Sequence, residues 1–320
     1  MPISLKSAAG VGGFLRQERL ILESGQFVAP FDGAYLVTAI GGGGSGAKWT
    51  PTANGSVATG AAAGGLAQKL VRLKKGDVLT LVIGAGGIAP TTSGQNGNAG
   101  GTTSVTGPGI ALTANGGEGG KTQAAVSGAV AGAVGGTASG GDLNVQGGGS
   151  GPASAATVSG CVAATGGGAV GIYGVGHSSG SVSNTATSSQ VQCSGGAGVG
   201  GKSGDVSGTN AAASKGGSAV SGSADVPSSA SAVTPPSNLG SNNAGLQNRL
   251  LAPAGAGGGS FPGGGSDGST NSGAGMFAGS GASPNMSGPP GYGAGSGAAA
   301  ITVSAGGQGC VVIEWNQEIA

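Results

Sequence analysis

One segment of this sequence matches a phosphate-binding loop residue for residue. Gly196 to Ser203 reads Gly-Ala-Gly-Val-Gly-Gly-Lys-Ser, which fits GxxxxGK[ST]. In nucleotide hydrolases the backbone N–H groups of such a loop cradle phosphates, its Lys reaches them and its hydroxyl holds Mg²⁺. That chemistry needs a strand before the loop and a helix after it, and the residues that follow, Asp-Val-Ser-Gly-Thr-Asn-Ala, are no helix. We therefore expect no nucleotide site here and expect Lys202 to be a solvated side chain.

Other groups that could carry chemistry are sparse. His177 is the single histidine, too few for a histidine metal cluster, and none of the eleven acidic residues falls in a recognisable catalytic context. Cys161, Cys193 and Cys310 include no CxxC pair, so a zinc site has no support. Two states of these cysteines remain open: three reduced thiols, or a disulfide between Cys161 and Cys193. The sequence predicts a protein that is not an enzyme, with no cofactor and no metal.

Composition restricts the elements that can position any site. The chain of 320 residues contains 78 Gly, and only 7% of its residues are charged, with a net charge of +1. Gly costs about 1 kcal/mol per helix position relative to Ala, which argues against a helical or doubly wound enzyme. The even charge balance argues against nucleic acid or a membrane surface as partner. We see no apolar run that could span a bilayer, and the start of the chain does not resemble a signal peptide.

Strand patterns lie near both ends of the chain. Residues 25–40 read as a strand, a Pro/Asp/Gly turn and a β-branched strand, and residues 66–83 read as a β-hairpin around a Lys-Gly-Asp turn. The basic residues of this pair, Lys69, Arg72, Lys74 and Lys75, are interpreted as a solvated face. Residues 300–303 and 310–315 predict two more strands. Residues 1–24 predict a short helix or a strand, and serve either as an attachment segment or as an extra edge strand.

The middle of the chain, residues 84–299, follows another rule. Glycines recur every third residue, as at Gly195, Gly198, Gly201 and Gly204. Three is the period of polyproline II, whose backbone groups must find partners on neighbouring segments. We expect short polyproline II rods stacked within the chain and joined by Ser/Thr/Asn/Pro turns, with disorder as the alternative. The predicted division is therefore 1–24, then 25–83 with 300–320 as sandwich strands, and 84–299 as the glycine-rich region.

Several of these motifs resemble a known family. The pattern Gly25-x-Phe27-x-Ala29-Pro30, running through Gly33 and Tyr35 into the glycines at 41–46, is similar to the start of the glycine-rich domains of bacteriophage tail-fibre and adhesin proteins. Residues 75–87, 100–105, 112–120 and 306–315 resemble later blocks of the same domains. The resemblance covers about residues 25–315.

The resemblance implies a fold and a role. It implies a jelly-roll-like β-sandwich with a large inserted bundle of polyproline II helices, and a virion protein of the tail fibre or tail tip, made in the host cytoplasm. Its expected partners are a bacterial surface receptor, either polysaccharide or outer-membrane protein, and other virion proteins, reached through residues 1–24; a homotrimer is expected. The large side chains of the glycine-rich region are the candidate receptor contacts, or else plugs of the rod bundle: Trp49, Tyr173, His177, Phe261, Phe277 and Tyr292.

Three other functions compete with the adhesin. A purely structural virion part, such as a fibre segment, collar or capsid decoration, would use the same fold without binding a receptor. An ice-binding protein could present flat Thr/Ala faces, although strands at both ends and irregular turns argue against it. A nucleotide hydrolase comes last, because it depends on Lys202 and the loop rejected above.

Overall fold

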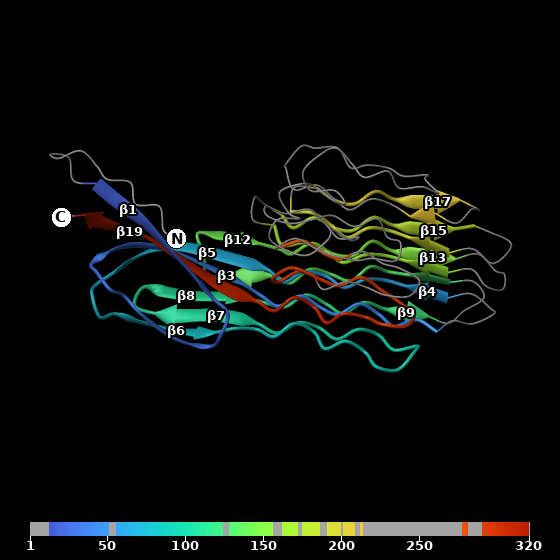
Figure 1. Ribbon diagram of the computed structural model, residues 1–320, viewed down its shortest axis with the longest axis horizontal. Coiled ribbons are helices and arrows are strands. Elements are labelled where there is room, and N and C mark those ends of the chain that lie inside the picture. Colours follow the sequence, from blue (N-terminus) through green and yellow to red (C-terminus); the bar gives the residue numbers. More distant parts are fainter. Residues whose placement is uncertain are drawn as a thin grey trace.

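The computed structural model describes residues 13–50, 56–123, 128–155, 162–171, 175–185, 191–199, 201–208, 212–213, 277–280 and 290–319 (Figure 1). These residues form nineteen strands and no helix, which confirms the all-β prediction. Among them, accordingly, no helix is long and apolar enough to cross a membrane. The molecule is elongated. Two larger sheets lie at one end, two sheets of short strands lie at the other, and glycine-rich segments run between them (Figure 1).

The two larger sheets are each built from five strands. Sheet A runs in the order β1 (Gly13–Ile21), β19 (Cys310–Ile319), β3 (Gly33–Ile40), β5 (Leu66–Leu73) and β12 (Leu143–Val145). Sheet B runs in the order β11 (Ala138–Ser139), β8 (Ile110–Ala114), β7 (Thr103–Gly107), β6 (Val78–Val82) and β2 (Gly25–Val28). All pairs within both sheets are antiparallel.

Two smaller sheets, called here the first and second tip sheets, lie at the opposite end. The first contains β10 (Gly128–Val130), β13 (Ala153–Ala155), β15 (Val182–Asn184) and β17 (Val206–Gly208). The second contains β18 (Ala212–Ala213), β16 (Val191–Cys193), β14 (Val162–Ala164), β4 (Ser56–Ala58) and β9 (Thr122–Gln123). The strands β13, β15 and β17 are parallel, as are β4, β14, β16 and β18.

Sheets A and B enclose the main apolar core. Alternation in β3 and β6 sends Tyr35, Val37, Leu79 and Leu81 into one cluster between the two sheets. Phe27, Tyr35 and Trp315 pack their rings together with centroids 5.7 to 6.0 Å apart, with Tyr35 buried and Trp315 partly buried against the same cluster. The buried Tyr35 hydroxyl donates to the Phe31 carbonyl over 2.8 Å, so its polar end is satisfied.

The predicted hairpin over residues 66–83 is wrong. Both strands form, but β5 pairs with β3 and β12 in sheet A, whereas β6 pairs with β2 and β7 in sheet B. The turn around Gly76 therefore carries the chain from one sheet to the other. Val71 of β5 and Leu79 of β6 both lie in the core between sheets A and B. The two strands therefore face each other across the core, and each hydrogen-bonds to other strands of its own sheet.

Glycine-rich segments and sheet strands lie on both sides of the predicted boundary at residue 84: segments 41–49 and 59–65 precede it, and two strands of sheet B interrupt the predicted region 84–299. Strands β7 and β8 lie inside it and pair with each other and with β6 in sheet B. Val105, Ile110 and Leu112 alternate inward around a Gly-Pro-Gly turn, and Gly109 takes a φ of +71° that favours glycine there. Val105, Ile110 and Leu112 thus add apolar side chains to the core, beyond those of the strands near the two ends of the chain.

Residues 300–303 do not form the predicted strand. Ala300 and Val303 are buried, while Ile301 and Thr302 between them are exposed, with Ile301 61% exposed. A spacing of three between buried positions does not fit the two-residue repeat of a strand. At the other predicted terminal segment, residues 13–21 form edge strand β1, one of the two alternatives for residues 1–24, and β19 confirms the strand expected at 310–315.

Hydrogen bonds between the glycine-rich segments recur every third residue. Within residues 41–49, one set of N–H groups bonds to segment 59–65, a second to segment 95–101, and a third to residues 296–307. The three donor sets are Gly41, Gly44 and Ala47; Gly42, Ser45 and Lys48; and Gly43, Gly46 and Trp49. Segment 41–49 thus has three neighbours, and its backbone donors are satisfied between segments rather than within one.

Glycine is required where these segments approach each other. A Cβ on Gly42 would overlap the Ala85 carbonyl, one on Gly100 the Gly42 carbonyl, and one on Gly116 the Gly100 carbonyl. The missing side chains are therefore the condition for backbone pairing. The abundance of glycine reflects close packing.

Candidate functional site

The end of the molecule formed by the tip sheets carries a repeated local structure. Strands β13, β15 and β17 pair in register, with Ala153 beside Val182 and Val182 beside Val206. Each of these residues lies two positions after a Ser-Gly dipeptide, at Ser150, Ser179 and Ser203. The chain therefore passes through the same conformation three times, and each pass stacks on the previous one.

Buried serine hydroxyls link successive passes. The Gly151 N–H donates to Ser179 Oγ over 3.0 Å, and the Gly180 N–H donates to Ser203 Oγ over 2.7 Å. The same arrangement recurs for Gly60 with Thr165 and for Gly166 with Ser194. In each case the glycine after one hydroxyl residue donates to the hydroxyl of the next segment. This set of contacts is called the hydroxyl ladder below.

The outer face of the first tip sheet presents small hydroxyl side chains. Ser154, Ser183 and Ser207 occupy equivalent register positions, and the Ser154 and Ser183 hydroxyl oxygens lie 3.3 Å apart. Val182 and Val206, beside them in sequence, point inward to a cluster shared with the second tip sheet. The row is thus held in place by buried neighbours, and its hydroxyls can exchange hydrogen bonds with a polar ligand.

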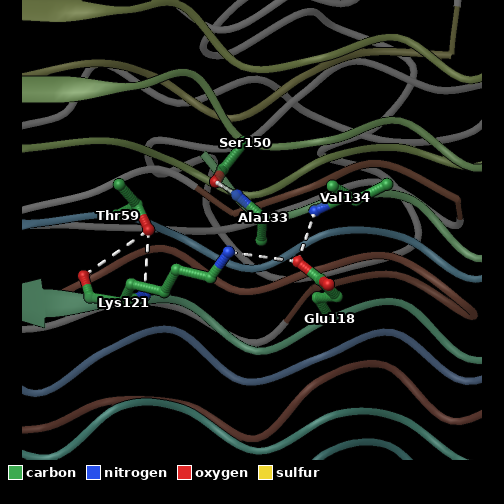
Figure 2. A network of polar contacts seen from close by, with 6 residues as sticks. All are labelled: Thr59, Glu118, Lys121, Ala133, Val134 and Ser150. Atoms are coloured by element: carbon green, nitrogen blue, oxygen red, sulfur yellow. Dashed lines mark hydrogen bonds and ion pairs between the residues drawn. The ribbon is translucent and has the colours of Figure 1, made fainter. Parts of the chain in front are cut away.

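A polar network joins glycine-rich segments next to the tip sheets (Figure 2). The stacked glycine-rich segments are called the bundle below. The Glu118 carboxylate accepts from the Val134 N–H over 3.0 Å and from Lys121 Nζ over 3.3 Å. Thr59 Oγ1 accepts from the Lys121 N–H over 2.9 Å. The Val134 N–H bond, followed by the Lys121 contacts, lowers the pKa of Glu118 against the opposing effect of burial. The carboxylate is therefore committed to holding neighbouring segments together.

Ser150 extends the same network one segment further. Its Oγ accepts from the Ala133 N–H over 2.8 Å, as Figure 2 shows beside the Glu118 contacts. Four glycine-rich segments are thereby joined by side chains in addition to their backbone bonds. The network therefore stabilises the packing of these segments against one another.

Trp49 is placed inside the bundle. Its side chain is 5% exposed and packs with Ala58, Ala164, Cys193 and other small residues. Its indole Nε1 is buried without a hydrogen-bond partner in the described part of the chain. Burial removes the ring from any receptor surface, so the expectation that Trp49 is a contact residue is wrong. The small neighbours leave the space that the indole fills.

The other predicted contact residues are scattered. Phe277 and Tyr292 pack on each other with ring centroids 6.5 Å apart and against a buried cluster containing Ile40 and Val170, where sheet A joins the glycine-rich segments. Both are partly buried, so they correspond to the plugs considered as the alternative. His177 is partly exposed, and its carbonyl accepts from the Ala169 N–H over 3.1 Å. Tyr173 and Phe261 lie outside the described residues.

The segment that matches a phosphate-binding loop is part of the hydroxyl ladder. Ser203 Oγ is buried and donates to the Gly195 carbonyl over 2.6 Å, so its hydroxyl is already used. Lys202 is exposed and contacts Asp205 at 3.5 Å. Strand β17 follows the segment where the motif requires a helix. The local structure supports the prediction that no nucleotide binds here.

The described cysteines are buried thiols. Cys193 and Cys310 are free, and Cys161 lies outside the described residues. Burial raises the pKa of each of the two described thiols to about 12. In the described ranges, no group of three or more His, Cys, Asp or Glu side chains could hold a metal ion.

Sequence reasoning missed the hydroxyl ladder and the tip sheets. The available signal was the Ser-Gly or Thr-Gly dipeptide, repeated at positions 45, 59, 150, 165, 179, 194, 203 and 296. Every one of these eight hydroxyl residues is buried, whereas the Ser-Gly and Thr-Gly dipeptides that begin at 24, 93, 106, 139 and 207 have exposed hydroxyl residues. A polar residue that recurs before glycine at buried positions indicates side chains that bond to a neighbouring backbone.

No protein-family model matches this chain, and no curated protein matches it. The resemblance to the glycine-rich domains of phage fibre proteins therefore stays a prediction from its motifs.

Proposed function

We propose that this chain is a bacteriophage virion protein that binds a bacterial surface receptor at the tip of a tail fibre or tail. One observation carries the proposal. The paired strands β1 and β19 lie at one end of an elongated molecule and the tip sheets lie at the other (Figure 1). Such polarity suits attachment to the virion at the first end, through residues 1–24, and contact with the host at the second.

The finer fold is part of this proposal. Sheets A and B form a jelly-roll-like sandwich, and the glycine-rich segments are polyproline II rods. Burial that repeats every third residue supports the rods: Gly84, Gly87 and Pro90 are buried in one segment, and Ala114, Gly117 and Gly120 in another. The three sets of backbone bonds made by residues 41–49 support them independently.

The described part of the tip favours a polar receptor surface. The row of Ser154, Ser183 and Ser207 offers hydroxyls on three neighbouring strands whose backbones lie about 4.8 Å apart. Hydroxyl groups both donate and accept hydrogen bonds, which matches the hydroxyls of a surface polysaccharide. An outer-membrane protein is the other receptor class that the resemblance implies.

Binding to cells tests the proposal directly. Fluorescently labelled protein should bind saturably to some members of a panel of Gram-negative bacteria and should block adsorption of a phage that uses the same host. Ser207→Arg places a long cation on the exposed tip face and should weaken binding at least about tenfold. Thr106→Arg, exposed on the outer face of sheet B, is the matched control and should bind as the parent does.

A structural virion component is the second candidate, and one observation favours it. Trp49, Phe277 and Tyr292 are packed into the bundle or its junction with sheet A, so the large side chains of these segments stabilise the fold. A folded protein that binds no phage-susceptible host would support this candidate and contradict the adhesin.

A further inference from the structure

Strand β1 is an edge strand whose outer side has no strand partner among the described residues. It pairs with β19 along all nine of its residues, but β19 pairs with β3 only from Cys310 to Trp315. The outer half of the β1–β19 ribbon is therefore two strands wide. An isolated two-stranded ribbon is marginally stable in water, and a long open edge is a template for another strand.

The charges along β1 are incompletely matched within one chain. The Arg16 guanidinium forms an ion pair with Glu314 of β19. Glu18 lies directly opposite Glu314 in the register, and like charges in that position destabilise a sheet. In the described part of the chain Glu18 forms no ion pair, and its side chain is exposed.

We propose that β1 pairs antiparallel with β1 of a second copy of this chain, about a two-fold axis through Gln17. This register places Arg16 opposite Glu18 of the second copy, and Glu18 opposite its Arg16. Each Glu18 then has a cation directly opposite it on one side, whereas its own chain places Glu314 opposite it on the other. At the ends of the contact, Leu20, which is 40% exposed, falls opposite position 14, a phenylalanine.

Charge pattern and strand length together select this register, since a centre at Leu15 or Leu20 also opposes no like charges but pairs only part of β1. Self-pairing antiparallel strands have their two-fold axis at a residue, so the candidate centres can be compared one by one. A centre at Arg16 or Arg19 puts two arginines opposite each other, and a centre at Glu18 puts two glutamates opposite each other. Gln17 is the centre among these four that leaves no like charges opposed and uses the whole strand.

The pairing would extend sheet A to ten strands across the axis and would close the open edge of β1. It also explains why a second copy is the preferred partner. A strand of a different protein would need its own complementary sequence, whereas Arg-Gln-Glu is complementary to itself when it is reversed. Strand β1 lies within residues 1–24, the segment proposed to attach to the virion, but the test of the pairing uses the isolated chain and does not depend on receptor binding.

Charge exchange tests the pairing. Sedimentation of the parent chain over roughly 1 to 100 µM should show a mass that rises from 28.9 kDa to twice that value. Arg16→Glu gives glutamates at 16 and 18 and opposes only like charges across the axis. Glu18→Arg gives arginines at both positions with the same effect. Each variant alone should dissociate at least about ten times more readily than the parent.

Mixing separates a pairing effect from a folding defect. A mixture of the two single variants places glutamates opposite arginines at every charged position, so heterodimers should form although each variant alone is monomeric. The double variant Arg16→Glu/Glu18→Arg should dimerise as the parent does. Arg72→Glu, exposed on β5 of the same sheet, is the control and should leave the parent's dimerisation unchanged.

Several outcomes would overturn the inference. These are a parent that stays monomeric over the whole range, a trimeric mass as the family resemblance implies, and single variants that dimerise normally. A mixture that stays monomeric, when both variants melt cooperatively by circular dichroism, would do so as well.

Discussion

The Gly180 N–H donates a hydrogen bond of 2.7 Å to the buried hydroxyl oxygen of Ser203, twenty-three residues further along the chain. The same hydroxyl donates to the Gly195 carbonyl over 2.6 Å. One small side chain therefore joins three glycine-rich segments. Ser179 makes the equivalent contacts one pass earlier, to Gly151 and Gly166. The ladder compensates in part for a region with little apolar surface to bury.

Replacing Ser203 by Ala should destabilise the protein. The change leaves the Gly180 N–H and the Gly195 carbonyl buried without these partners, at a cost of about 1–3 kcal/mol in the free energy of unfolding. Thermal or urea unfolding measures the loss. Ser207→Ala removes an exposed hydroxyl four residues away and should change stability by less than about 0.5 kcal/mol. Equal losses in the two variants would contradict the role given to the ladder.

A single methyl group should be enough to disrupt the glycine packing. In Gly116→Ala the new Cβ would overlap the Gly100 carbonyl, and a backbone atom cannot move aside without breaking its own hydrogen bonds. We expect a loss of more than about 2 kcal/mol in unfolding free energy. Gly25→Ala is the matched control, because no atom lies within 4 Å of its Cβ position. That change should be neutral or slightly stabilising.

Much of the strand content followed from the sequence, because alternation and turn residues are local signals. The segments at 25–40, 66–83 and 310–315 all form strands. Their pairing was not local: β5 and β6 meet across the core instead of forming a hairpin, since the apolar faces of both strands are buried between the sheets. Alternation alone does not distinguish a hairpin from an arch.

The candidate site was harder to predict. Aromatic residues in a glycine-rich region suggested exposed contacts, but Trp49 fills the space left by small neighbours and is buried. The parallel pairs of the first tip sheet join residues 24 or 29 positions apart, Val182 with Val206 and with Ala153, and β14 pairs with β4 over 106 positions. With three-residue strands, the apolar pattern is too short to indicate such pairing. The repeated Ser-Gly dipeptides were the available signal.

The buried thiols should make stability fall in alkaline solution. Burial raises the pKa of Cys193 from 9.0 to about 12 in the folded chain, whereas the unfolded chain loses this proton near pH 9. Between these values the unfolded state binds fewer protons, so the free energy of unfolding decreases by about 1.4 kcal/mol per pH unit from this thiol. Below pH 9 both states are protonated and the thiol adds no pH dependence.

Cys193→Ala isolates this effect, because lysines, tyrosines and the other cysteines titrate alike in parent and variant. The stability advantage of the parent over the variant should be constant from pH 7 to 8.5 and should then shrink by about 1 kcal/mol per unit above pH 9. Urea unfolding at each pH gives both values. The same burial should protect Cys193 from alkylation until the bundle opens, so its labelling rate should follow unfolding. A parent–variant difference that stays constant to pH 10.5, or rapid labelling of Cys193 in the folded chain, would contradict the buried position of this thiol.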